Sequence, residues 1–198
     1  PPARKDRLAD YRIAVMVDAP HAEVDCDVQR QIRNVADAVE KAGASVSFSA
    51  RPNFDTKEAD DLFHRLLGAA LSGRHSSESF DSNLKAVHAL ESEDTSDRAR
   101  ALRNVTLSHR DWLIANEARH KMREKWADFF RDWDLLLCPA AASAAPVHNH
   151  EGAPFDRPIV VNGKEMPLST QFFWAGYSGC SFLPSTVAPV GLTPAGLT

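Results

Sequence analysis

The sequence predicts an α/β fold. Short β-branched or leucine-rich runs alternate with segments of helical periodicity, and two of these helical segments lead into a strand within a few residues. The chain has 198 residues, of which 43% are hydrophobic and 25% are charged. These proportions are typical of a globular protein, and a chain of this length buries enough surface to hold a core without a metal or disulfides.

The first fifty residues are predicted to form a strand, a helix and a second strand. Residues 12–17 are apolar and largely β-branched, and they end at a proline-containing turn, as a buried strand does. A helix with one apolar stripe is expected to begin after Asp25 as its N-cap and to end at Gly43 in a left-handed C-cap. Residues 45–48 follow as a strand, so a right-handed βαβ crossover is expected.

The middle of the chain is predicted to be helical. One helix is expected over residues 58–71, and the Gly-, Ser- and Asp-rich residues 72–82 are expected to break it. A long helix with one apolar stripe is expected over residues 107–133. It leads into a leucine-rich strand at 135–138, which Pro139 closes because the residue before a proline favours extended geometry.

The remainder is predicted to be rich in loops. Residues 140–158 are aperiodic, Asn162-Gly163 is a hairpin-type turn, and residues 183–191 form an extended segment bounded by prolines. Between them, residues 169–182 are aromatic and small. Functional residues are often found on loops of this kind.

The net charge excludes some classes of partner. With 23 Lys+Arg against 27 Asp+Glu, the charge is −4, and no long basic run is present. We therefore expect neither a nucleic-acid partner nor a polybasic surface that binds a membrane. The long helix alternates basic and acidic residues, which favours an exposed, ion-paired face. These residues are Arg110, Arg119, Lys121, Arg123 and Lys125 with Asp111, Glu117, Glu124 and Asp128.

Cysteine usage indicates a reducing compartment. Cys26, Cys138 and Cys180 are odd in number and far apart, so neither a disulfide framework nor a paired zinc motif is expected. No run of 18 apolar residues and no signal-peptide core is present. We expect a cytoplasmic protein with no cofactor and no metal.

Two polar motifs are candidates for chemical sites. Ser82 and Lys85 have the Ser-x-x-Lys spacing that activates a serine on a helix, but no companion triplet accompanies them, and a solvated helix is the favoured interpretation. His148 and His150, followed by Glu151, offer metal-ligand chemistry, yet polar surface is favoured in so Ala- and Pro-rich a loop. No complete catalytic constellation is predicted in this chain.

The aromatic residues near the C-terminal end are the candidates for a substrate pocket. Phe172, Phe173, Trp174 and Tyr177 lie among small residues and would suit either an apolar pocket wall or a helix packed into the core. Spacing alone favours the core. Cys180 is interpreted as a small buried hydrophobe.

In their order and spacing, several segments resemble the C-terminal portion of amidase signature enzymes. The strongest are Asp134 to Pro139 and Leu183 to Gly191, and three weaker ones precede them along the chain. The weaker segments are Tyr11 to Val15, Ala42 to Ala44 and Arg103 to Leu113. The resemblance covers nearly the whole chain.

The resemblance implies a hydrolase that cleaves carboxylic amides through a serine acyl-enzyme. It also implies a mixed β-sheet flanked by α-helices. The family's Ser-Ser-Lys triad lies in an N-terminal portion with no counterpart here, so no catalytic residue is assigned in this chain. The stretch matching residues 169–183 lies near the active-site cleft of the family, which shifts the interpretation of the aromatic residues from core towards pocket wall.

Residues 1–198 are thus expected to be the C-terminal portion of a single amidase domain. The chain starts without Met and stops after a Pro- and Gly-rich stretch, so the N-terminal triad portion and the extreme C-terminus are expected to be absent. The expected partners are a small amide substrate, the missing portion, and a second copy through exposed apolar edges. The chain alone is expected to be inactive. The alternative is a non-catalytic α/β module that binds a small ligand or a partner chain.

Overall fold

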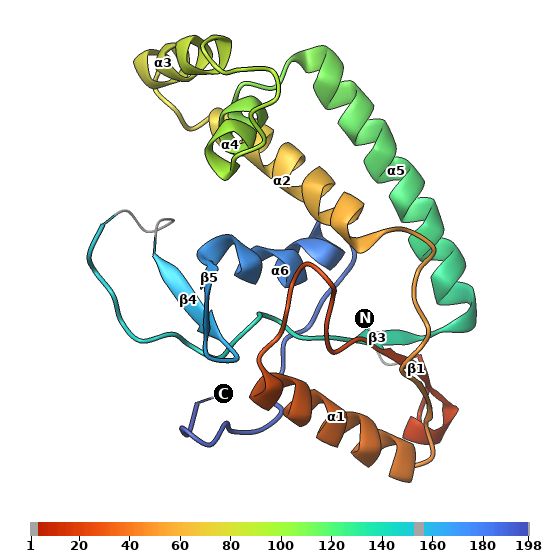
Figure 1. Cartoon of the computed structure of the whole chain (residues 1–198). Coiled ribbons are helices and arrows are strands. Elements are labelled where there is room, and N and C mark those ends of the chain that lie inside the picture. Colours follow the sequence, from red (N-terminus) through yellow and green to blue (C-terminus); the bar gives the residue numbers. More distant parts are fainter. Residues whose placement is uncertain (1–3, 153–156, 198) are drawn as a thin grey trace.

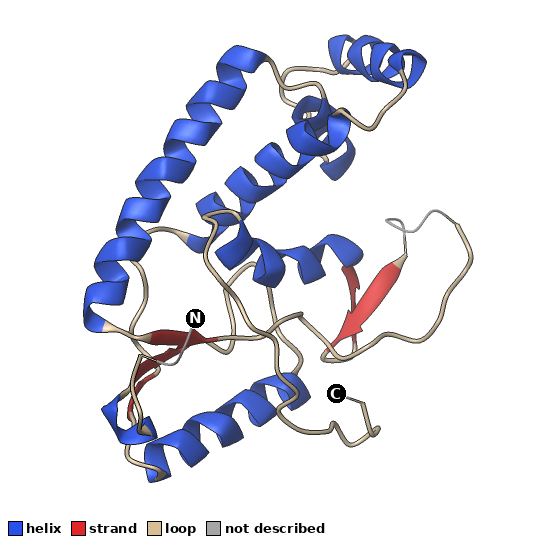
Figure 2. Cartoon of the chain, turned by 180° about the vertical axis from the view of Figure 1, so that it is seen from behind, coloured by secondary structure: helices blue, strands red, loops and turns tan. Residues whose placement is uncertain are grey.

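A computed structural model of the chain describes residues 4–152 and 157–197. The expected α/β architecture is confirmed: helices flank a small parallel sheet (Figures 1 and 2). A short 3-10 turn, η1 (Leu8–Asp10), precedes the first strand.

Among the described residues, the main sheet consists of three short parallel strands. They are β1 (Arg12–Val15), β2 (Ser45–Ser47) and β3 (Leu135–Leu137), in the spatial order β2-β1-β3. All three were predicted, β1 and β3 from their apolar runs and β2 from its place after the first helix. β1 therefore lies in the middle, and the strand order reverses between β1 and β3, since the chain goes first to one side of β1 and later to the other.

The central strand β1 buries side chains on both faces. Ile13 and Val15 pack on one side with Ile32 of helix α1 (Cys26–Lys41). Ala14 lies on the other side, in a larger core that includes Trp126. The alternation of side chains along a strand explains this division. It places α1 on one face of the sheet and the remaining helices on the other, as Figure 1 shows.

Helix α1 begins and ends as predicted. The Asp25 carboxylate accepts a hydrogen bond from the backbone N–H of Asp27, which satisfies one free donor of the first turn. Gly43 follows the helix with φ of 99°, in the left-handed region that a side chain disfavours. The chain reverses there into β2.

Helices α2 (Thr56–Ser72) and α5 (His109–Asp132) confirm the two helices predicted in the middle of the chain. Ser108 caps α5, its hydroxyl accepting from the N–H of Asp111 at 3.0 Å. Trp126 and Met122 of α5 face the core.

Two further helices correct the prediction that residues 72–82 only break a helix. They are α3 (Ser77–His88) and α4 (Asp97–Val105). Ser76 and Ser96 cap them, accepting hydrogen bonds from residues three positions later. α2 packs against α4, α5 and α6, and Gly68 permits the close approach to α4, because a Cβ there would lie 2.6 Å from that of Asn104.

The antiparallel pairing lies in a separate hairpin, β4 (Pro158–Val161) and β5 (Lys164–Pro167). Asn162 and Gly163 form its turn with φ of 51° and 76°, as the Asn-Gly pair predicts. The Asn162 side chain accepts a hydrogen bond from the N–H of Cys26 at 2.8 Å. The hairpin is thereby tied to the start of α1.

The chain then forms a 3-10 turn, η3 (Leu168–Gln171), and the short helix α6 (Phe172–Gly179). α6 lies beside α2, and the following residues 180–197 contain neither helix nor strand. Within this tail, the Gln31 side chain of α1 donates to the carbonyl of Leu192 at 2.8 Å. The tail therefore returns to the face of the molecule that holds α1 (Figure 1).

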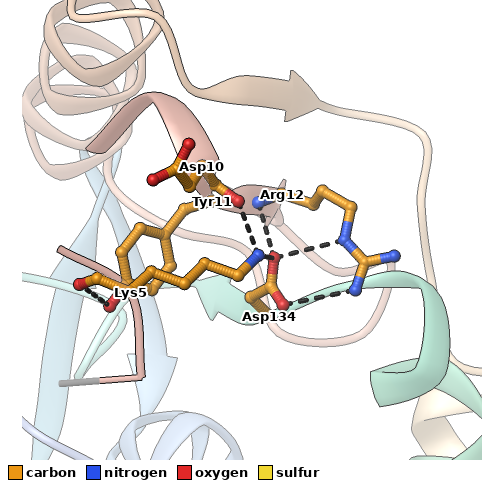
Figure 3. Close-up of polar contacts among 5 residues, drawn as sticks. All are labelled: Lys5, Asp10, Tyr11, Arg12 and Asp134. Carbon is orange, nitrogen blue, oxygen red and sulfur yellow. Dashed lines mark hydrogen bonds and ion pairs between the residues drawn. The ribbon is translucent and has the colours of Figure 1, made fainter. Parts of the chain in front are cut away.

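A charged junction links the N-terminal segment to the start of β3 (Figure 3). The Asp134 carboxylate accepts from Lys5 Nζ at 2.6 Å, from the backbone N–H of Arg12 at 2.8 Å and from Nε and Nη2 of the Arg12 guanidinium, both at 3.2 Å. The Asp134 side chain is 19% exposed. This junction aligns β1 with β3 from residues more than a hundred positions apart.

Candidate functional site

Helix α6 brings the four predicted pocket residues together, but mostly into the core. Phe173, Trp174 and Tyr177 are 2–3% exposed, whereas Phe172 is half-buried. Their rings contact one another and the helix α5 ring of Trp126, with centroids 4.9 to 5.2 Å apart. The pocket-wall role of these residues stays a prediction, and neither of the two grooves described below is lined by them.

The buried aromatic rings carry polar atoms without partners. Trp126 Nε1, Trp174 Nε1 and Tyr177 Oη have no hydrogen-bond partner among the described residues. Burial raises the pKa of the Tyr177 hydroxyl far above its ordinary value, and the charge of Arg51 opposes that shift. The Arg51 guanidinium donates to the carbonyl of Val15, at the carboxyl end of β1.

A cluster that the sequence analysis missed lies beside the aromatic rings. The Asp60 carboxylate lies between two imidazoles, 3.4 Å from His64 Nε2 and 4.0 Å from His21 Nε2. Burial lowers the pKa of His21, and the charge of Asp60 opposes that shift. The His21 ring meets Phe173 edge-on at 4.7 Å. Only the Asp60–His64 spacing of four was visible in the sequence.

Two grooves follow helix α5. One, of about 250 Å³, lies between α5 and the start of α2, against Phe54, Leu62 and Met122. The other, of about 410 Å³, lies between the outer face of α5 and residues 181–183. Its wall includes Arg123, Phe130 and Phe182.

The outer face of α5 is less ion-paired than its charge alternation predicted. Lys121 and Arg131 have acidic partners, Glu117 at 4.0 Å and Asp128 at 3.0 Å. No ion pair of Arg110, Arg119, Arg123 or Lys125 is found among the described residues. The prediction of an ion-paired face is therefore wrong for these four side chains.

The polar motifs weighed from sequence are solvent-exposed. Ser82 and Lys85 lie on the exposed surface of α3, and no hydrogen bond joins them. His148 and His150 are exposed, with ring centroids 6.0 Å apart. Both observations agree with the favoured interpretations of solvated helix and polar surface.

One group of three potential metal ligands is found within residues 4–152 and 157–197. It consists of Asp25, Cys26 and Asp27, whose ligand atoms lie within 4.8 Å of one another. The Asp25 carboxylate is already used, since it accepts from the N–H groups of Asp27 and Asn162. This group is therefore explained by the cap of α1 and its link to the hairpin.

All three cysteines are free thiols. Burial raises the pKa of Cys138, which follows β3, to about 11. Burial also raises the pKa of Cys180, and the charge of Arg119 opposes that shift. Cys180 is 6% exposed, as expected of a small buried hydrophobe, and Cys26 is exposed.

The sequence matches a protein family described as Amidase over residues 1–198. No curated protein matches it. Within the described residues, each helix is too short or too polar to cross a membrane.

Two solved structures share the fold. A bacterial aryl acylamidase of the amidase signature family superposes with a TM-score of 0.63 at 22% identity, over 96% of this chain and 39% of its own. Fatty acid amide hydrolase superposes with a TM-score of 0.52 at 19% identity, over 74% of this chain and 25% of its own. The chain thus spans well under half the length of either enzyme.

Proposed function

Because this chain belongs to the amidase family, we propose that it is the C-terminal part of an enzyme that hydrolyses carboxylic amides to a carboxylate and ammonia or an amine. The observation that carries the proposal is the family match over residues 1–198. In our proposal the reaction proceeds through a serine acyl-enzyme. The similarity to two amide-cleaving enzymes supports the fold that this chemistry would use.

We place the catalytic serine outside this chain. Serine nucleophiles need a base within hydrogen-bond reach and preorganised donors for the oxyanion. In the part of the chain that the structure describes, no hydrogen bond joins a serine hydroxyl to a lysine or histidine. We therefore assign no catalytic role to Ser82 and Lys85, and we expect the chain alone to be inactive.

In this proposal the chain supplies supporting structure and one side of the substrate site. Phe172, Phe173, Trp174 and Tyr177 would back the pocket for a small amide, with α6 holding them against α2. The remaining portion of the amidase domain would add the nucleophile and close the pocket. We also propose a cytoplasmic location, because free cysteines are usual in a reducing compartment.

The edge of the sheet is the expected contact with that remaining portion. β3 pairs only with β1 among the described residues, and Leu135 on it is 49% exposed. An apolar edge strand is a template for pairing with another chain. The isolated chain should therefore self-associate, and sedimentation that shows a monomer at all concentrations would count against this part of the proposal.

Amide hydrolysis by two purified proteins tests the proposal. Ammonia release from aliphatic and aromatic amides is measured for the 198-residue chain and for the longer protein with the remaining portion of the domain. We expect turnover by the longer protein alone, unchanged by Ser82→Ala. Turnover by the isolated chain would contradict its inactivity, and loss of that turnover in Ser82→Ala would identify Ser82 as the nucleophile. A longer protein inactive on every amide would favour the binding module instead.

A further inference from the structure

The groove between α5 and residues 181–183 has a chemistry of its own. Phe130, Phe182 and Leu183 give it apolar walls, and Arg123 places a cation at its side. Its volume of about 410 Å³ falls in the range of small-molecule sites, roughly 300–1,000 Å³. Such sites combine apolar walls with a few placed polar groups.

Two arginines contact the Phe182 ring, and neither has an ion pair among the described residues; of the two, Arg123 lines the groove. The guanidinium of Arg119 lies 4.4 Å from the ring centroid of Phe182, and that of Arg123 lies 5.6 Å from it. Arg119 donates only to the side-chain carbonyl of Asn116, and its Nε is buried without a partner among the described residues. Two like charges around one ring repel each other, so an anion placed between them would be stabilised.

A buried hydroxyl adds a second, independent indication of a ligand. Ser181 lines the groove and is 1% exposed, yet its Oγ has no hydrogen-bond partner among the described residues. Leaving a buried hydroxyl unpaired costs free energy, which a ligand acceptor would recover.

The turn that ends α6 presents the Phe182 ring to this groove. The backbone N–H of Phe182 donates to the carbonyl of Gly179 at 3.1 Å, and that of Leu183 donates to the carbonyl of Ser178 at 3.2 Å. This pair of hydrogen bonds places Phe182 in the left-handed region at the helix end, with φ of 59°, and leaves it 61% exposed.

We propose that this groove binds a carboxylate carried on an aromatic or aliphatic body. The carboxylate would accept hydrogen bonds from Arg123 and Ser181, and the body would lie against Phe130 and Phe182. Arginine suits a planar carboxylate because its guanidinium donates two parallel hydrogen bonds. This binding does not depend on the amidase activity. In the parent enzyme the ligand would be an acidic substrate or product.

Two other titratable side chains line the groove and determine which ligands it excludes. His120 and Glu124, both on α5 and both exposed, line it together with Arg123. The Glu124 carboxylate repels a ligand with negative charge along its whole length. A ligand with a single carboxylate at one end and an uncharged body therefore fits best.

Titration calorimetry of the 198-residue chain with benzoate tests the proposal, with benzamide as the uncharged ligand of the same shape. We expect saturable one-to-one binding of benzoate and at least about tenfold weaker binding of benzamide, because the charge-assisted hydrogen bonds are lost. Equal affinities for the two ligands, or no saturable binding of benzoate, would overturn the proposal.

Variants locate the site. Arg123→Gln should weaken benzoate binding by about tenfold or more, and Ser181→Ala by several fold. Arg131→Gln is the matched control, since Arg131 lies on the same helix but is paired with Asp128. Benzoate should also shift the side-chain Nε–H resonance of Arg123 in the unmodified chain, which needs no variant. If Arg131→Gln weakens binding as much as Arg123→Gln does, or if that resonance does not move, the carboxylate lies elsewhere.

Discussion

Charge is arranged differently midway along α5 and just after it. Just after α5, the Asp134 carboxylate is held by Lys5 and by the backbone and guanidinium of Arg12. Midway along the helix, Arg119 and Arg123 lie around the Phe182 ring, and neither is ion-paired with a carboxylate among the described residues. The first arrangement stabilises the fold, whereas the second leaves guanidinium groups available to bind a ligand. A fully paired charge therefore indicates structure, and an unpaired one beside a buried hydroxyl indicates a ligand.

The largest expected effect is at the Asp134 junction. Asp134→Asn should lower the free energy of unfolding by about 2 kcal/mol, since several charge-assisted hydrogen bonds are weakened together. Urea denaturation at pH 7 measures this. Asp128→Asn is the control: its carboxylate is 64% exposed and pairs only with Arg131, so it should change stability by less than about 0.5 kcal/mol. Equal effects of the two variants would show that the fully paired carboxylate stabilises the fold no more than an exposed ion pair does.

The pH dependence of stability sharpens the same point. The hydrogen bonds from Arg12 hold the pKa of the Asp134 carboxyl well below its usual range, whereas in the unfolded chain it is about 3.9. Its stabilisation is thus complete above that unfolded value and is lost as the pH falls towards the folded one. The stability difference between the unmodified chain and Asp134→Asn should therefore shrink below about pH 4. A stability difference that stays constant down to pH 2 would show that the charge of the Asp134 carboxylate does not stabilise the fold.

Removal of an unpaired buried group should stabilise the chain instead of destabilising it. Ser181→Ala deletes a buried hydroxyl without a partner among the described residues, so it should raise the free energy of unfolding by up to about 1 kcal/mol. The same denaturation experiment measures this gain. A destabilisation of more than about 1 kcal/mol would show that the Ser181 hydroxyl already has a hydrogen-bond partner in the free chain.

The smallest effect is expected at the unpaired arginine. Arg123→Gln should leave stability within about 0.5 kcal/mol, because the lost contact with the Phe182 ring is offset by relief of repulsion from Arg119. Its melting curve is compared with that of Arg131→Gln. A loss above about 1 kcal/mol would place Arg123 among the structural charges with Asp134.

Much of the fold could be predicted from local sequence. The apolar run of β1, the Asp25 cap of α1, the stripe of α5 and the Asn162 turn are each local signals, and the structure has each of them. The start of α3 and the whole of α4 were missed because serine and aspartate mark both loops and helix starts. Ser76 and Ser96 act as caps, which only the following hydrogen bonds reveal.

The candidate site could be predicted only in part. The aromatic composition of residues 172–177 marked them as core or pocket, and the structure buries three of the four rings. The groove was hidden, because the charge alternation of α5 suggested local ion pairs. Instead, Arg119 and Arg123 meet Phe182, about sixty positions further along the chain. Such long-range pairing leaves no local pattern in the sequence.

The most direct test of the central claim is covalent labelling with a serine-directed fluorophosphonate, followed by intact mass and peptide mapping. Our account places the amidase nucleophile outside these 198 residues. It predicts no adduct on the isolated chain, and on the longer protein a single adduct at a serine outside residues 1–198. An adduct on any serine of this chain, Ser82 or Ser181 included, would contradict the account.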